Sequence, residues 1–159
     1  MPTIANLSRR LIGSAIFTGL LMGGVATAAF GQATPEAIGK ATGMKIEIVL
    51  EGAALFAALE DNAAARDLLA LLPLAMTLED YAATEKIAYL PRKLTTQGSP
   101  DGYHPRAGDV AYYAPWGNIA VFYKDGRYSP GLVKLGTISG GQDILAKVTS
   151  VKATIATAR

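Results

Sequence analysis

The stretch GDVAYYAPWGNIAVFYKDG, residues 108–126, decides the fold of this chain. It holds two runs of β-branched and aromatic residues, 110–114 and 119–123, on either side of a Pro-Trp-Gly-Asn turn. Such runs are typical of strands, and the turn predicts that they pair as a hairpin. Both faces of each run are apolar, and a strand of this kind is covered on both sides. We therefore predict that one face fills a barrel and that the other lies under a loop or helix.

Strand signals recur at short intervals on both sides of this hairpin. Alternating apolar and polar residues predict further strands at 44–50, 54–60, 74–79, 132–138 and 148–156. Residues 63–72 are rich in Ala and Leu and predict a short helix that Pro73 ends, and residues 140–147 predict one more helical turn. Seven or eight strands with so little helix indicate a sandwich or a closed barrel.

Two intervening segments carry no clear strand signal. Residues 80–94 mix charges with scattered apolar residues, and Pro91 argues against a central strand there. Residues 95–109 are rich in Gly and Pro and predict a long loop.

The N-terminus predicts export. Residues 1–10 carry Arg9 and Arg10 and no acid, 11–29 carry no charge, and small residues follow, which is the pattern of a secretory signal peptide. We predict a signal peptide over 1–33, a linker over 34–43, one domain over 44–157, and a periplasmic or secreted protein with no stable membrane span after cleavage. The arginine pair fits either the general secretory or the twin-arginine route, and an uncleaved anchor is the alternative.

Charge and composition exclude several functions. Loss of residues 1–33 leaves 13 basic and 13 acidic residues without a basic run, so the sequence predicts no nucleic-acid surface. There is no cysteine and a single histidine, His104, so no metal site is expected. The segment GTISGG, 136–141, lacks the lysine and spacing of a phosphate loop, and we predict no cofactor.

Three motifs carry a resemblance to a known family. Thr84-Glu85-Lys86-Ile87, Leu90-Pro91 and the YYAPWGN segment at 112–118 resemble the bacterial cyclophilin-like domain family of unknown function, over residues 44–157. The resemblance implies a mainly β fold: a closed eight-stranded cyclophilin-like β-barrel with one or two short capping helices. Cyclophilins isomerise X-Pro bonds with a strand arginine in a Phe-His-Arg type segment. No such segment exists in this chain, so the resemblance implies no activity.

The aromatic hairpin and the acidic segment near residue 80 together suggest a ligand site. A concentration of aromatic rings with a few polar groups is what a pocket for a small molecule or an extended peptide requires. We predict that such a site is formed by Glu79, Tyr81, Glu85, Arg92, Tyr113, Trp116 and Asn118.

Other interpretations of these residues stay open. Trp116 could instead be a lid over the barrel mouth, and the charges of the acidic segment could be ion pairs on a solvated loop. The alternative functions are a divergent prolyl isomerase that uses Arg92, an acid–base enzyme that uses Glu79 or Glu85, and a purely structural or interaction domain.

Overall fold

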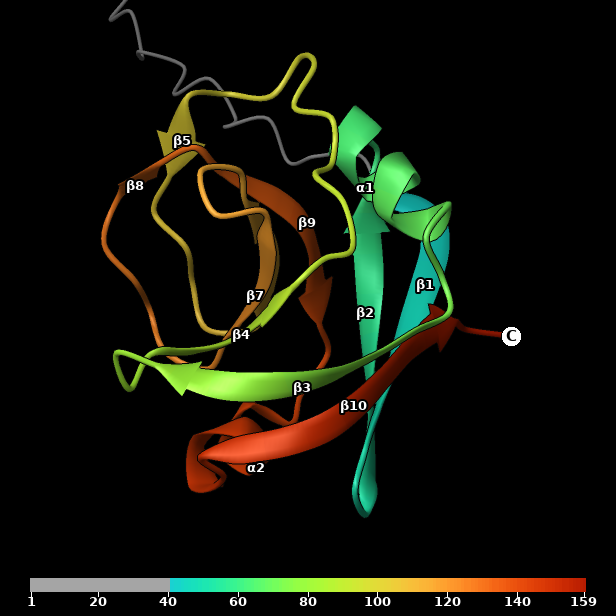
Figure 1. Cartoon of the computed structure of the whole chain (residues 1–159), viewed down its shortest axis with the longest axis vertical. Helices are drawn as coiled ribbons and strands as arrows, with labels where there is room; N and C mark the ends of the chain where they lie inside the picture. The colour runs from blue at the N-terminus through green and yellow to red at the C-terminus, as the bar shows by residue number, and fades with distance from the viewer. Residues whose placement is uncertain (1–40) are drawn as a thin grey trace, which may run out of the picture. The chain divides into compact units, whose positions relative to one another are not determined.

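The chain folds into a closed β-barrel, described for residues 41–159 by a computed structural model (Figure 1). Neighbouring strands are antiparallel and follow the order β1-β10-β3-β4-β7-β6-β9-β2, after which β2 pairs with β1 and closes the ring. The barrel strands are β1 (Ala41–Leu50), β2 (Ala53–Glu60), β3 (Leu74–Tyr81), β4 (Glu85–Tyr89), β6 (Asp109–Tyr113), β7 (Asn118–Phe122), β9 (Leu132–Ile138) and β10 (Ser150–Thr157). The predicted eight-stranded barrel is confirmed.

The N-terminal predictions fall mostly outside the described residues. The predicted signal peptide, 1–33, lies wholly outside them, as does most of the predicted linker, 34–43. The last residues of that linker segment already belong to β1, which begins at Ala41 and pairs there with Glu60 of β2. Within residues 41–159, no helix combines the length and the apolar composition that crossing a membrane requires.

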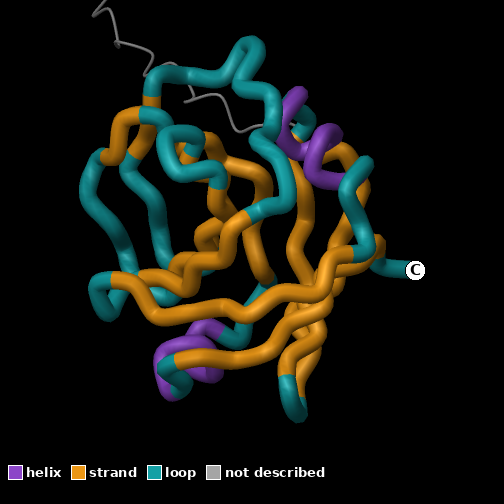
Figure 2. The backbone as a smooth tube through the Cα atoms, viewed as in Figure 1, coloured by secondary structure: helices purple, strands orange, loops and turns teal. Residues whose placement is uncertain are grey.

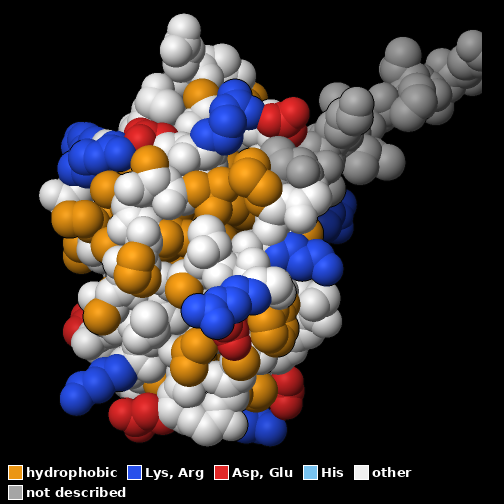
Figure 3. Space-filling view, turned by 90° about the vertical axis from the view of Figure 1, so that its right-hand side faces the viewer, with side chains coloured by type: hydrophobic (Ala, Val, Ile, Leu, Met, Phe, Trp, Pro, Cys, Tyr) orange, Lys and Arg blue, Asp and Glu red, His pale blue; other side chains and the backbone are white. Residues whose placement is uncertain are grey.

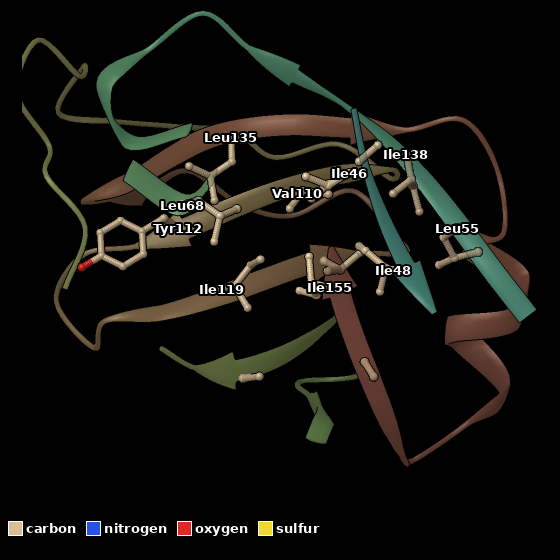
Figure 4. Close-up of a cluster of buried hydrophobic side chains, with 14 of the residues drawn as sticks. Ile46, Ile48, Leu55, Leu68, Val110, Tyr112, Ile119, Leu135, Ile138 and Ile155 are labelled. Atoms are coloured by element: carbon tan, nitrogen blue, oxygen red, sulfur yellow. The ribbon is translucent and has the colours of Figure 1, made fainter. Parts of the chain in front are cut away.

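The barrel interior is filled by side chains. Aliphatic residues from facing strands converge on it in Figure 4, with Ile46, Ile48, Ile119 and Ile155 all fully buried. The largest fully buried side chain, Tyr112, points along the same interior, and its hydroxyl accepts a hydrogen bond from the Leu94 amide at 3.1 Å. A buried phenol needs such a partner. The interior is therefore a packed core and not the ligand site.

Two short helices add to this core. Helix α1 (Ala63–Leu69) begins at Asn62, whose side-chain oxygen accepts a hydrogen bond from the Ala65 amide at 2.8 Å, a common N-cap arrangement. Helix α2 is Gln142–Lys147. Each helix contributes one fully buried leucine to the cluster that fills the barrel, Leu68 from α1 and Leu145 from α2. The prediction of one or two short capping helices is confirmed.

Strand β4 was not predicted, because its alternation is reversed. Lys86 takes an inward position and is fully buried, while Glu85 and Ile87 point outward. The Lys86 ammonium reaches the Asp80 carboxylate at 2.5 Å and the Val148 carbonyl. The charges of this segment are thus not all on a solvated loop. The strand ends at Tyr89, before Pro91, so the proline does not interrupt the ladder.

The turn between β3 and β4 also lacks the usual sequence signal. The strands are joined by residues 82–84, and Ala82 and Ala83 both have φ of 51°, the left-handed conformation that Asn and Gly adopt most easily. The Asp80 carboxylate accepts a hydrogen bond from the Ala83 amide at 3.2 Å. This bond and a backbone hydrogen bond from the Thr84 amide to the Tyr81 carbonyl, at 3.1 Å, hold the turn against the preferences of its own residues.

One wall of the barrel is covered on its outside. The segments on either side of the two-stranded sheet of β5 (Gly102–Tyr103) and β8 (Ser129–Pro130) run as long loops beside the strands in Figure 2. Beneath them lies a second apolar cluster of outward-facing residues: Ala111, Ala120, Phe122 and Leu132. This arrangement confirms that the hairpin β6–β7 has one face in the barrel and the other under loops.

Charges of both signs are interspersed on the face shown in Figure 3. Lys and Arg side chains alternate there with Asp and Glu and with hydrophobic side chains. That face thus carries no large field of one sign.

Candidate functional site

A pocket of about 160 Å³ lies on the outside of the covered wall, and we call it the wall pocket. Eight residues line it: Tyr81, Glu85, Tyr113, Trp116, Asn118, Phe122, Ser129 and Leu132. They come from β3, β4, β6, β7, β8, β9 and the turn between β6 and β7. The pocket therefore depends on the closed barrel and on the loops that cover it.

Two hairpins bring the polar and aromatic side chains together. In the β3–β4 hairpin, Tyr81 and Glu85 are direct partners across the ladder, which places both side chains on the outer face. In the β6–β7 hairpin, Tyr113 and Asn118 are partners in the same way. Because β4 pairs with β7, and Glu85 stands opposite Phe122, the two hairpins form one continuous wall.

Three aromatic rings form a corner of the wall pocket. The Trp116 ring lies 5.4 Å from the Tyr81 ring and 5.4 Å from the Tyr113 ring, measured between centroids, with interplanar angles of 89° and 79°. Edge-to-face pairs of this kind are a favoured aromatic geometry. Trp116 is 45% exposed although it contacts both rings. It therefore lies against the outer wall and not over the barrel mouth.

Glu85 is the one carboxylate that lines the wall pocket, and its environment disfavours the charge. Burial raises the pKa of Glu85 to about 7. Among residues 41–159, no Lys or Arg forms an ion pair with it. A carboxyl group that exchanges its proton near neutral pH is able to bind a cation, donate a hydrogen bond or transfer a proton.

Asn118, another residue that lines the wall pocket, has an acceptor atom without a partner. Its side chain is 1% exposed, and its Oδ1 atom is buried without a hydrogen-bond partner. Leaving a buried carbonyl oxygen unpaired costs about 1–3 kcal/mol, so such atoms are rare in folded proteins. At the wall of a pocket, a bound donor would satisfy this atom.

Two residues of the predicted site do not line the wall pocket. Glu79 is exposed on β3, opposite Ile87 of β4. Arg92 forms two hydrogen bonds with the Asp67 carboxylate of α1, at 3.0 Å from Nη1 and 2.5 Å from Nη2. These bonds lower the pKa of Asp67 and raise that of Arg92. Arg92 thus does bind a carboxylate, but that carboxylate is Asp67 of the same chain, and it occupies the guanidinium group.

Three lining residues were missed by the sequence analysis: Phe122, Ser129 and Leu132. Phe122 was assigned to the apolar hairpin, and its alternation with Val121 carried a signal for the outer face. Ser129 lies in a two-residue strand, β8, that pairs with β5, and no local pattern predicts that pairing. Among the described residues there is also no group of three His, Asp or Glu side chains that could hold a metal ion.

Comparison with known proteins adds family and fold. The model of the cyclophilin-like family matches residues 48–156. The solution structure of a hypothetical protein from Archaeoglobus fulgidus is similar, with a TM-score of 0.54 at 18% sequence identity, over 75% of this chain and 98% of that chain. At this identity the likeness shows the fold alone. No curated protein sequence matches the chain.

Proposed function

This chain belongs to the cyclophilin-like family, and we propose that it is a binding domain whose wall pocket holds a small molecule or one side chain of an extended peptide. The observation that carries the proposal is that Asn118 lines a pocket with aromatic walls while its Oδ1 atom is buried and has no hydrogen-bond partner. An apolar pocket with a few convergent polar groups is the usual form of a ligand site.

The shape of the surroundings favours a ligand that extends beyond the pocket. A second hollow adjoins the wall pocket and shares Tyr81, Glu85, Phe122 and Ser129 with it. A ligand anchored at the aromatic corner has a groove for its remainder, which suits a peptide or a molecule with a tail. The barrel interior on the other side of the wall is filled by side chains, so a ligand of this pocket binds on the outer surface, where Tyr81 and Trp116 are exposed.

Trp116 provides the test, because it is the chain's single tryptophan and lies in the wall pocket. We would titrate the protein with a library of small amines, amides, alcohols and carboxylates and follow tryptophan emission, with binding sites mapped by amide NMR shifts. We expect binders whose shifts centre on Glu85 and Asn118. Trp116→Ala should abolish those shifts, whereas Phe56→Ala, at a 46% exposed aromatic residue of β2 outside the pocket, should leave them intact. Absence of any binder, or shifts centred elsewhere, would refute the proposal.

A second candidate, acid–base catalysis, is favoured by the same carboxyl group. A pKa near 7 suits a general acid or base, and Glu85 has it, whereas Glu79 lies outside the pocket. The measurement that decides it is turnover of any ligand found above. A ligand that the wild-type protein converts to a product, and that the Glu85→Gln variant does not convert, would support catalysis. A ligand that both proteins leave unchanged would support binding alone.

Export is a separate proposal that rests on residues 1–33 alone. We propose cleavage after Ala33 and a periplasmic or secreted location. Mass spectrometry of the protein recovered from its own cells should find a mature N-terminus at Thr34. A chain that retains Met1 and stays with the cytoplasmic or membrane fraction would contradict this.

A further inference from the structure

We propose that the wall pocket selects a primary alkylammonium group, either of a small amine or of a lysine side chain. This inference rests on the proposed binding function and adds the chemistry of the ligand. Three features carry it: an unpaired carboxylate, a set of oxygen acceptors, and an aromatic corner.

The first feature is a carboxylate without a counter-ion. Glu85 lines the pocket, and no cationic side chain of the described residues pairs with it. Four other buried or half-buried carboxylates of the described residues each have a cationic partner: Asp80 pairs with Lys86, Asp67 with Arg92, and both Asp109 and Glu60 with Lys134. A half-buried carboxylate favours a cation that enters its pocket, because the cation restores the interaction lost with water.

The groups around Glu85 bring neither a positive charge nor a second negative charge into the pocket. Burial first, and then nearby carboxylates that include Glu85, raise the pKa of Tyr103 on β5 and of Tyr123 after β7, so both phenols stay neutral at physiological pH. Tyr81 and Phe122, the residues directly opposite on β3 and β7, carry no cation either. Asp125 and Arg127 line the adjoining groove, outside the wall pocket.

The second feature is the set of oxygen atoms. Besides Glu85, two residues that line the wall pocket carry side-chain oxygens: Asn118, whose buried Oδ1 has no partner, and Ser129. The Ser129 hydroxyl already donates its proton to the Arg127 carbonyl at 3.2 Å, which leaves its lone pairs as acceptors. A primary ammonium has three N–H donors and no acceptor, which complements three acceptor groups.

The third feature is the aromatic corner of Trp116, Tyr81 and Tyr113. Near-perpendicular rings turn their faces in different directions, and a cation is attracted to the face of an aromatic ring, most strongly to that of tryptophan. The volume of about 160 Å³ has room for about five water molecules at about 30 Å³ each, which suits a head group and a short methylene stem.

The test uses probes of one length that differ in charge and in donors: butylammonium, 1-butanol, pentanoate and butyl-trimethylammonium. Trp116 emission reports binding, measured at about pH 8, where the Glu85 carboxyl is ionised. We expect butylammonium to bind on the order of tenfold more tightly than 1-butanol and than the trimethylated ion, and pentanoate to bind weakest. The advantage over 1-butanol should shrink at about pH 5.5, because protonation removes the charge of Glu85.

Two variants separate the pocket charge from the net charge of the protein. Glu85→Gln should reduce the advantage of butylammonium to about twofold or less, whereas Glu79→Gln, which removes an exposed carboxylate outside the pocket, should preserve it. Equal binding of 1-butanol, tighter binding of the trimethylated ion, or an unchanged preference in Glu85→Gln would overturn the ammonium proposal and leave the pocket as a binding site. Failure of all four probes and of the fragment library would overturn both.

The source of the ammonium group is distinguished by one further comparison. A short capped peptide with one central lysine extends into the adjoining groove, whereas butylammonium fills the wall pocket alone. On the order of tenfold tighter binding of the peptide would assign the site to a lysine side chain. Equal affinity would assign it to small amines.

Discussion

Replacing Glu85 with glutamine should stabilise the fold, by an amount that grows from about pH 4.5 to about pH 7. The carboxyl group titrates near pH 4.5 in the unfolded chain, and burial raises its pKa to about 7 in the fold. The folded state therefore holds the Glu85 proton more tightly than the unfolded state does. Above about pH 4.5 the free energy of unfolding of the wild type falls, and it stops falling above about pH 7. Glutamine has the same shape and no charge, so the variant lacks this fall.

The size of the effect follows from the same interval. Burial raises the pKa from 4.5 to about 7, and each unit corresponds to about 1.4 kcal/mol, so the gain in the free energy of unfolding has an upper limit of about 3 kcal/mol. The side chain is only half-buried, and water screens part of the desolvation, so we expect about 1–2 kcal/mol at about pH 8 and close to zero at about pH 4.5. A destabilising carboxylate at a pocket wall is the kind of feature that function retains against stability.

The assay is urea unfolding followed by far-UV circular dichroism, at steps of about one pH unit from 5 to 8. Glu79→Gln is the matched control, since it removes a carboxylate that is exposed on the neighbouring strand. A Glu85→Gln effect that is constant across this range would reflect packing and not ionisation. A variant less stable than the wild type at about pH 8 would refute the reasoning outright.

Two further predictions concern contacts that hold the site in place. Asp80→Ala should lower the free energy of unfolding by about 3–5 kcal/mol, because it leaves the fully buried Lys86 ammonium without its carboxylate. Lys86→Met should lower it less, because Asp80 keeps its contact with solvent and its hydrogen bond from the Tyr123 hydroxyl at 2.6 Å. Urea unfolding of both variants checks this order. Asn62→Ala should lower the free energy of unfolding by about 1–2 kcal/mol, since the side chain caps α1 and also donates to the Lys134 carbonyl of β9 at 2.8 Å; a loss below about 0.3 kcal/mol in the same assay would contradict the capping role.

The wall pocket brings together some of the residues that the sequence singled out and not others. The aromatic residues of the hairpin and the Tyr81–Glu85 segment stood out by residue type, and five of the seven predicted side chains line one pocket. Glu79 and Arg92 were grouped with them by proximity along the chain alone. Glu79 shares the outer face of β3 with Tyr81, but it stands opposite Ile87 and does not line the pocket. The Arg92 guanidinium pairs with the carboxylate that the fold brings near it, Asp67 of α1.

Strand β4 shows why some elements of the fold could not be predicted from the sequence. Strand β4 places Lys86 inside the barrel, which is favourable only because Asp80 and the Val148 carbonyl meet its ammonium there. Val148 lies 62 positions away in the chain, so no local pattern contains that partner. Strand β8 is similar, because two residues become a strand only through pairing with β5.

The sequence by itself determined the strand-rich fold, the two-sided burial of the 108–126 hairpin, and the concentration of aromatic residues beside an acidic segment. These properties depend on side-chain type and on the two-residue period of a strand, both of which are local. Tertiary structure alone decided which outward side chains share a pocket, that Glu85 is without a cation, and that the Asn118 oxygen is unpaired. Those properties depend on barrel closure and on loops that cover the wall, and so on contacts between residues far apart in the chain.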